Sequence, residues 1–258
     1  MPSPASTHKP TVNTRGAPVR IAMWSGPRNI STAMLRSFGS RPDTSVTDEP
    51  LYAHYLKVTG VAHPGRDEII AAHECDWRKV AAMLTGPVPA GRAVWYQKHM
   101  AHHLLPMIER GWLDDLTHAF LIREPDEMVA SLLKTFPGAG LADTGLPQQC
   151  EIFDRVAERL GRGPPVVLAS DVLKDPAALL EALCDALGIP FLPAMLAWPA
   201  GKRETDGAWA PYWYAAVETS TGFELYRRRH VELTDAQARL VDECRPYYEK
   251  LYALRLRA

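Results

Sequence analysis

The stretch V-R-I-A-M-W-S-G-P-R-N-I-S-T-A-M-L-R-S-F, residues 19–38, decides the fold of this chain. Its first part, 19–24, is a short apolar run followed by Ser-Gly-Pro, a turn sequence, so we predict a buried strand that ends there. From 29 to 38 the apolar residues recur at helical spacing, which predicts a helix. A strand that passes through a tight turn into a helix is a building unit of α/β sheets.

Strand and helix signals continue to alternate along the chain. Four more strands are predicted: a short one at 44–47, ending at Asp-Glu-Pro, and others at 94–97, 118–122 and 165–169. Helical periodicity predicts helices at 125–134, 148–160 and 176–187, and a threonine cap begins a final helix at 234–254. This alternation indicates an α/β fold with a central parallel sheet flanked by helices on both faces.

Three segments stand outside the alternation. Residues 59–92 carry little strand signal, which predicts helices or a lid over the sheet edge. Residues 198–222 are dense in Trp, Tyr, Pro and Gly, which predicts an ordered loop beside the site. Residues 1–18 are rich in Pro, Ser, Thr and Gly without an apolar signal-peptide core, so we expect a disordered tail. A chain of 258 residues then fits a single domain at 19–258.

The charge balance excludes a general attraction to polyanions. With 29 basic and 30 acidic residues the net charge is −1, so an anionic ligand needs a local cluster of positive charge. No apolar run approaches the roughly 20 residues of a membrane span. The cysteines, Cys75, Cys150, Cys184 and Cys244, are far apart, which predicts reduced, packed thiols. We therefore expect a cytoplasmic protein without nucleic-acid or membrane partners; the sequence leaves the oligomeric state open.

The turn after the first predicted strand carries the donors of an anion site. The start of a helix offers free backbone N–H groups and a partial positive charge. In S-G-P-R-N-I-S-T-A, Arg28 adds a full charge, and neutral donors follow at Asn29, Ser31 and Thr32. The loop lacks the G-x-x-x-x-G-K-[ST] pattern, so it predicts no Mg²⁺-nucleotide cradle. The alternative is a plain strand-to-helix turn with a solvated arginine.

The loop P-R-N-I-S-T resembles the P-[RK]-S-G-T-T loop of the sulfotransferase superfamily, whose members bind 3′-phosphoadenosine 5′-phosphosulfate (PAPS). The resemblance implies a P-loop-type three-layer sandwich. Arg28 falls on the basic residue of that loop and Asn29 on its serine. Ser31 and Thr32 fall on its hydroxyl pair, and Ile30 replaces the usual glycine. The resemblance thus implies that residues 28–32 bind the donor.

Further segments are similar to other elements of the same superfamily. L-I-R-E-P-D-E-M-V-A-S resembles V-R-D-P-R-D-V-A-V-S, which implies that Arg123 and Ser131 hold the 3′-phosphate of the donor. The segments at 166–176 and 183–190 are similar to its structural E-D-L-x-x-D-P and F-L-G-x-P elements. Lys202 and Arg203, upstream of D-G-A-W, are similar in position to its R-K-G and G-D-W segment, which closes over the 3′-phosphate.

Two other signatures narrow the resemblance. W-S-G-P-R-N and D-E-P-L-Y-A-H-Y are similar to those of a bacterial subgroup, which is related to domains in some proteins labelled branched-chain aminotransferase-like. The chain carries no evident pyridoxal-phosphate lysine motif, so that label implies nothing about its chemistry.

Three residues are candidates for the chemistry. Lys98 follows a predicted strand, where it could reach the bridging or sulfonate oxygens of the donor. The pair Lys98-His99 is similar to the K-T-H segment of cytosolic sulfotransferases, in which the histidine is the base, but the intervening threonine is absent here. Glu49 in T-D-E-P is the rival base, and an ordinary hydrogen-bonded role remains open for both. We expect His99 to be the base and Glu49 to serve acceptor binding.

Two further groups of side chains are of interest: histidines that follow Lys98, and aromatic residues within the predicted loop at 198–222. His102 and His103, with His99, lack a carboxylate or cysteine partner nearby, so we expect no metal site. A cluster of aromatic residues either lines an acceptor pocket or packs in the core; its members are Trp209, Tyr212, Trp213 and Tyr214.

The resemblance implies a PAPS-dependent sulfotransferase that moves a sulfuryl group in line to a hydroxyl or amine of a small-molecule acceptor, with a general base and no metal. A nucleotide-dependent phosphoryl transferase is the enzymatic alternative, and it should require Mg²⁺. A catalytically silent nucleotide- or partner-binding protein of the same fold is the other alternative, favoured by Ile30 and by the short Lys-His spacing.

Overall fold

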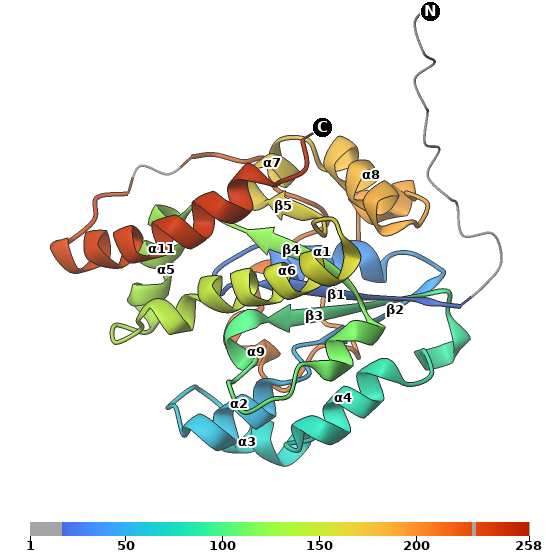
Figure 1. The fold of residues 1–258 in the computed structure, drawn as a ribbon, viewed down its shortest axis with the longest axis horizontal. Coiled ribbons are helices and arrows are strands. Elements are labelled where there is room, and N and C mark those ends of the chain that lie inside the picture. The colour runs from blue at the N-terminus through green and yellow to red at the C-terminus, as the bar shows by residue number, and fades with distance from the viewer. Residues whose placement is uncertain (1–16, 229–230, 258) are drawn as a thin grey trace, which may run out of the picture.

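The computed structural model describes residues 17–228 and 231–257. Its centre is a five-stranded parallel sheet in the order β2-β3-β1-β4-β5 (Figure 1). The strands are β1 Val19–Ser25, β2 Thr44–Asp48, β3 Val94–Met100, β4 Thr117–Ile122 and β5 Val166–Leu168. All five predicted strands are present, and the predicted fold class is confirmed.

Eleven α-helices lie in the described part of the chain: α1 Ser31–Gly39, α2 Tyr52–Thr59, α3 Arg66–Ala72, α4 Trp77–Thr85, α5 Pro125–Thr135, α6 Leu146–Leu160, α7 Ala169–Lys174, α8 Pro176–Leu187, α9 Ala210–Trp213, α10 Ala215–Thr219 and α11 Asp235–Ala253. Residues 59–92 are largely helical, which agrees with one of the two predicted options. Thr234 caps α11 as predicted, because its hydroxyl accepts from the Gln237 amide. The short helix α7 directly after β5 is not predicted by the sequence.

Alternating side chains of the strands pack into two hydrophobic cores, one on each face of the sheet. Ala22 and Trp24 of β1 pack with α4, α6 and α11 on one face. Ile21 and Met23 pack with α1, α7 and α8 on the other. Two layers of helices around one sheet follow from this alternation, since successive residues of a strand point to opposite faces.

Helices α2, α3, α9 and α10 gather near the carboxyl ends of the central strands, whereas α5 packs against α6 and α11. A separate cluster joins α2 and α3 to the 198–222 segment, with Tyr52, Leu56 and Ile69 against Trp209 and Tyr214. The predicted loop at 198–222 therefore contains the short helices α9 and α10, and it lies beside the site described below.

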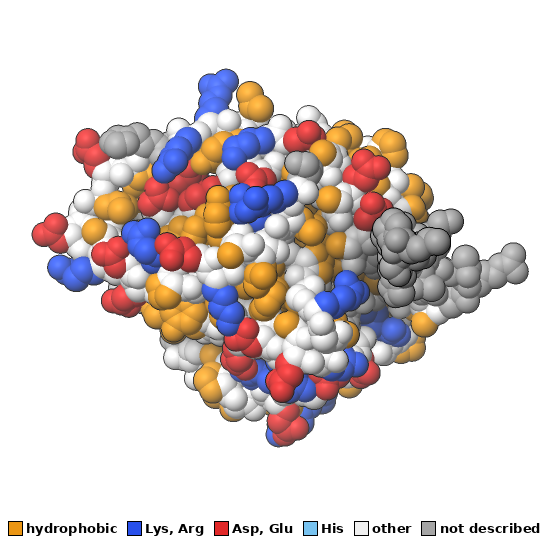
Figure 2. All heavy atoms as spheres, turned by 45° about the horizontal axis from the view of Figure 1, so that its top comes forward, with side chains coloured by type: hydrophobic (Ala, Val, Ile, Leu, Met, Phe, Trp, Pro, Cys, Tyr) orange, Lys and Arg blue, Asp and Glu red, His pale blue; other side chains and the backbone are white. Residues whose placement is uncertain are grey.

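The surface carries charges of both signs. Figure 2 shows Lys and Arg interspersed with Asp and Glu on one face, with hydrophobic side chains in small groups between them. Within residues 17–228 and 231–257, no helix has the length and apolar character needed to cross a bilayer. Of the expected tail at 1–18, only Ala17 and Pro18 fall inside the described residues.

Candidate active site

A cavity of about 410 Å³ opens where the carboxyl ends of β1, β2 and β3 meet the loop before α1. In parallel α/β sheets, ligands bind at this edge of the sheet. The whole predicted loop from Arg28 to Thr32 lines the cavity, together with Glu49 and Lys98. Two more predicted residues, Arg123 and Ser131, reach it from β4 and α5.

The backbone of the anion loop shows how an isoleucine fits where the resembled loop has glycine. Ile30 has φ −87° and ψ 20°, which any residue can adopt. Arg28 instead carries the left-handed conformation, with φ 55°. The Asn29 side chain closes the loop, because its Nδ2 donates to Leu121 O at 3.1 Å and its Oδ1 accepts from the Ile30 amide at 2.8 Å. Among the described residues no side-chain hydrogen bond caps α1 at Ile30, and the first residues of α1, Ser31 and Thr32, line the cavity.

Two guanidinium groups meet at one end of the cavity. Arg28 Nε donates to Ser131 Oγ at 2.9 Å, and Arg123 Nη1 donates to the Arg28 carbonyl oxygen. Burial, and then the charge of Arg123, lower the pKa of Arg28. Arg123 also pairs with Glu127 at 2.7 Å, which orients its guanidinium. The positive charges of Arg28 and Arg123 repel each other, so an anion bound beside both would be stabilised.

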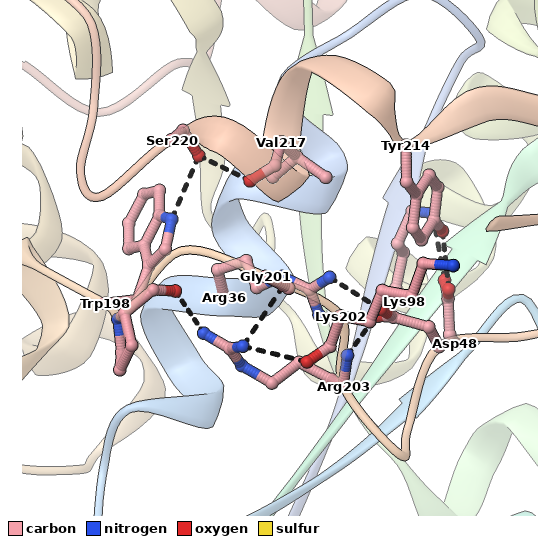
Figure 3. Close-up of polar contacts among 12 residues, drawn as sticks. Arg36, Asp48, Lys98, Trp198, Gly201, Lys202, Arg203, Tyr214, Val217 and Ser220 are labelled. Carbon is pink, nitrogen blue, oxygen red and sulfur yellow. Dashed lines mark hydrogen bonds and ion pairs between the residues drawn. The ribbon is translucent and has the colours of Figure 1, made fainter. Parts of the chain in front are cut away.

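Lys98 lies at the centre of a buried network. Only 1% of its side chain is exposed, and its Nζ donates to Asp48 at 2.9 Å, to Glu49 at 2.6 Å and to Tyr214 Oη at 2.8 Å. Tyr214 in turn donates to Asp48 and accepts from Trp209 Nε1 at 3.1 Å. Figure 3 shows Lys98, Asp48 and Tyr214 pointing toward one another. This network fixes the ammonium group at the cavity wall.

The charged groups of the network shift the pKa values of one another. Burial opposes the charged form of Lys98, but the carboxylates of Asp48 and Glu49 outweigh it and raise the pKa of Lys98 well above its ordinary value. Burial, aided by Asp48, also raises the pKa of Glu49 against the opposing effect of Lys98. Glu49 further has φ 35°, a left-handed conformation that is strained for a residue with a side chain. A carboxylate of raised pKa, held in a strained loop at a cavity, has the properties of a general base.

His99 does not reach the cavity. β3 continues to Met100, so Lys98 and His99 are successive strand residues on opposite faces. The His99 ring stacks on Trp24 at 4.3 Å between centroids, and its side chain lies in the core. Burial, followed by the charge of His118, lowers the pKa of His99 to about 3. This environment holds a neutral imidazole inside the protein, away from Glu49 and Lys98.

Lys202 and Arg203 also lie outside the cavity lining. The Arg203 guanidinium donates to carbonyl oxygens of its own loop, at Pro199, Gly201 and Lys202 (Figure 3). Its backbone amide donates to Asp206, which forms an ion pair with Arg36 of α1. The segment therefore fastens its loop to α1, and Lys202 is exposed.

The cavity contains residues that the sequence analysis did not select. Tyr52, His63, Phe136 and Phe223 line it, and Asp48 stands behind Glu49. The adjacent carboxylates in D-E-P-L-Y were a usable signal for Asp48. Of the four aromatic candidates, Trp213 and Tyr214 line the cavity, whereas Trp209 packs beneath it and the exposed Tyr212 donates to Glu68.

The remaining groups to consider are side chains that could bind a metal and the cysteine thiols. Within residues 17–228 and 231–257, no group of three or more His, Cys, Asp or Glu side chains is arranged to hold a metal ion. The thiols of all four cysteines are free, and three of them are buried.

The chain resembles known proteins over most of its length. Residues 19–254 match the family model described as sulfotransferase domain. The chain is 35% identical over 232 residues to branched-chain-amino-acid aminotransferase-like protein 2 of Arabidopsis thaliana. The match covers 90% of this chain and 41% of the relative. It is 39% identical over 207 residues to protein 1 of the same name and organism, covering 80% and 37%. This chain thus spans about two fifths of the length of both relatives.

One solved structure extends the comparison to the fold. A sulfotransferase from Alicyclobacillus acidocaldarius superposes with a TM-score of 0.53 at 14% identity, over 94% of this chain and 98% of the other. At that identity the likeness concerns the fold alone.

Proposed function

The chain belongs to the sulfotransferase domain family, and from that premise we propose that it moves a sulfuryl group from PAPS to a hydroxyl or amine of a small acceptor. The observation that carries the proposal is the meeting of three parts in one cavity: the Arg28 loop, the Arg123–Ser131 pair, and the buried Lys98–Glu49 pair. These parts come from four separate stretches of the chain.

The donor would lie along the anion loop. The amides at the start of α1, the Arg28 guanidinium and the hydroxyls of Ser31 and Thr32 suit the phosphosulfate. Arg123 and Ser131 suit the 3′-phosphate, because they sit beside Arg28 at one end of the cavity. The repulsion between the charges of Arg28 and Arg123 supports this assignment, since a bound anion relieves it. Lys202 and Arg203 have no part in it, because their loop lies outside the cavity.

The chemistry would depend on Lys98 and Glu49. Glu49 takes the proton of the acceptor as the new bond forms between the acceptor oxygen or nitrogen and sulfur. The bond between sulfur and the bridging oxygen breaks, and 3′-phosphoadenosine 5′-phosphate (PAP) leaves with that oxygen. Lys98 stabilises the negative charge that grows there. The base role moves from His99 to Glu49, because His99 is buried on the other face of β3.

The experiment combines binding and transfer. Calorimetry with PAP tests the donor site, and ³⁵S-labelled PAPS with a mixed panel of alcohols, phenols and amines tests transfer. We expect PAP to bind and label to appear in at least one acceptor. Failure of PAP to bind would overturn the proposal. Binding without any transfer would instead favour a silent binding protein of this fold.

A further inference from the structure

Aromatic rings form one wall of the cavity, next to Glu49. His63, Phe136 and Trp213 are half-buried and line it together, and their ring centroids are 4.4 Å apart for His63–Phe136 and 5.7 Å for Phe136–Trp213. They come from the loop before α3, the end of α5 and helix α9. Rings that are left partly open in a cavity expose apolar surface to water, and a ligand that covered them would be favoured.

This wall is separate from the proposed 3′-phosphate site. Ser131 of that site lies in α5, five residues before Phe136, which is about 8 Å along the helix axis at the usual helical rise, and Arg123 lies before the start of α5. Tyr52, which stands behind the wall, is bonded through its amide to the Glu49 carbonyl at 3.0 Å. The wall is therefore on the acceptor side of Glu49.

A hydrogen bond orients His63. Tyr52 Oη lies 2.7 Å from His63 Nδ1, and the two rings are 5.9 Å apart between centroids. Tyr52 is 3% exposed and its ring stacks on His103 at 4.6 Å, so the side chain that holds His63 is itself packed in place.

The same wall carries no positive charge. Burial lowers the pKa of His63, and it does the same for His102 and His103, so these imidazoles are neutral at pH 7. The three N–H donors of Lys98 are already engaged by Asp48, Glu49 and Tyr214, so the ammonium acts on a ligand only through its charge. An acidic group on an acceptor would therefore lose its hydration at this wall without gaining a hydrogen bond from a cation, and Glu49 would repel it.

We propose that the wall made by His63, Phe136 and Trp213, with Tyr52 behind it to orient His63, selects flat, uncharged aromatic acceptors that carry the reacting hydroxyl. This inference rests on the proposed function, because it names the acceptor class of the same site. Flat rings stack on Phe136 and Trp213, and the hydroxyl is directed at Glu49.

Three matched probes test the selection: 2-naphthol, its saturated counterpart trans-2-decalol, and its carboxylated counterpart 6-hydroxy-2-naphthoate. Binding is measured by saturation-transfer NMR in the presence of PAP, and transfer by label from PAPS. We expect 2-naphthol to bind and react at least about tenfold better than either counterpart. A roughly tenfold change in affinity is the size of effect that one or two aromatic contacts or a charge difference produce. Equal or better use of trans-2-decalol would overturn the inference and leave the proposed function standing.

Variants connect the selection to the wall. Trp213→Leu and Tyr52→Phe should each raise KM for 2-naphthol about tenfold with kcat changed less than twofold, since they remove stacking or the orientation of His63. The controls are Tyr252→Leu and Tyr212→Phe, which alter exposed rings outside the wall. Unchanged KM in both wall variants would overturn the inference.

Binding separates this inference from the proposed function. If PAP failed to bind while 2-naphthol bound and lost affinity in Trp213→Leu, the aromatic site would stand and the sulfuryl transfer would not. If PAP bound and 2-naphthol did not, the aromatic selection would be wrong.

Discussion

Lys98 and Glu49 form an ion pair of 2.6 Å between Nζ and Oε1, in which the lysine side chain is 1% exposed and the glutamate 12%. The glutamate is the more accessible partner, and it lies at the cavity while the lysine is anchored behind it by Asp48 and Tyr214. This geometry leaves the carboxylate available to an acceptor and keeps the ammonium fixed. In the proposed transfer, Glu49 would accept the acceptor proton and Lys98 would supply the fixed positive charge.

The first prediction concerns Glu49→Gln. The amide cannot take a proton, so turnover should fall by about 10²–10⁴, the usual contribution of a positioned general base. PAP affinity should stay within about twofold, because Glu49 faces the acceptor side. Steady-state transfer and calorimetry measure the two effects, with Glu151→Gln, at an exposed pair with Arg110, as the control. Near-normal turnover would show that the base lies elsewhere.

The second prediction concerns the donor site. Arg28→Ala and Arg123→Ala should each weaken PAP binding by about 1.5–3 kcal/mol, the range for hydrogen bonds to charged groups. Adenosine 5′-phosphosulfate, which lacks the 3′-phosphate, should bind the wild type more weakly, and Arg123→Ala should narrow that difference. Calorimetry decides it, with Arg155→Ala, at an exposed pair with Asp114, as the matched control. Full affinity in Arg123→Ala would remove the 3′-phosphate assignment.

The third prediction separates sulfuryl from phosphoryl transfer. PAP binding and label transfer should both continue in excess EDTA, because Lys98 and the arginines supply the positive charge that a phosphoryl transferase takes from Mg²⁺. The measurement is the ratio of rates with EDTA and with added Mg²⁺. An absolute requirement for Mg²⁺ would support the phosphoryl-transfer alternative.

Much of the fold could be predicted because its signals are local. Every strand except β2 contains a short apolar run, and Thr234 caps the last helix through its own side chain. The loop at Arg28 was predictable for the same reason, since strand, turn and helix follow one another in sequence. α7 was missed because Ala169–Lys174 follows β5 without a turn residue between them.

The site was less predictable because it depends on where strands end and on contacts far apart in the chain. The expected strand at 94–97 placed both Lys98 and His99 beyond its end, but β3 runs to Met100, and alternation sends His99 into the core. Lys202 and Arg203 were assigned from their similarity to a basic segment. That similarity could not reveal the ion pair between Asp206 and Arg36, 170 residues apart in sequence, that holds this loop on α1. The Tyr52–His63 contact likewise appears only once α2 and the loop before α3 are folded together.

The last prediction concerns the core histidines and pH. His118 accepts from Trp24 Nε1 at 3.0 Å on Nδ1 and reaches the Leu113 carbonyl at 2.9 Å with Nε2, an arrangement that needs the neutral ring. Burial lowers the pKa of His118 to about 4 and that of His99 to about 3. In the unfolded chain both pKa values return to about 6.5. Below that pH the unfolded chain binds more protons than the folded one, so stability is full above pH 6.5 and is lost as the pH falls toward 3–4.

For His99 alone the loss between pH 7.5 and pH 5 should be roughly 2 kcal/mol in the free energy of unfolding. Urea unfolding of wild type and His99→Gln at pH 7.5, 6.5, 5.5 and 5.0 measures it, and the difference between the two proteins removes the contribution of the carboxylates. The variant should be less stable at pH 7.5, because it loses the stack on Trp24, and should lose less stability on acidification. Its turnover at pH 7.5, corrected for the folded fraction, should stay within about threefold of wild type, since His99 lies outside the cavity. A parallel fall in both proteins would contradict the buried neutral state, and a turnover loss of 10² or more, the size expected for a base, would return that role to His99.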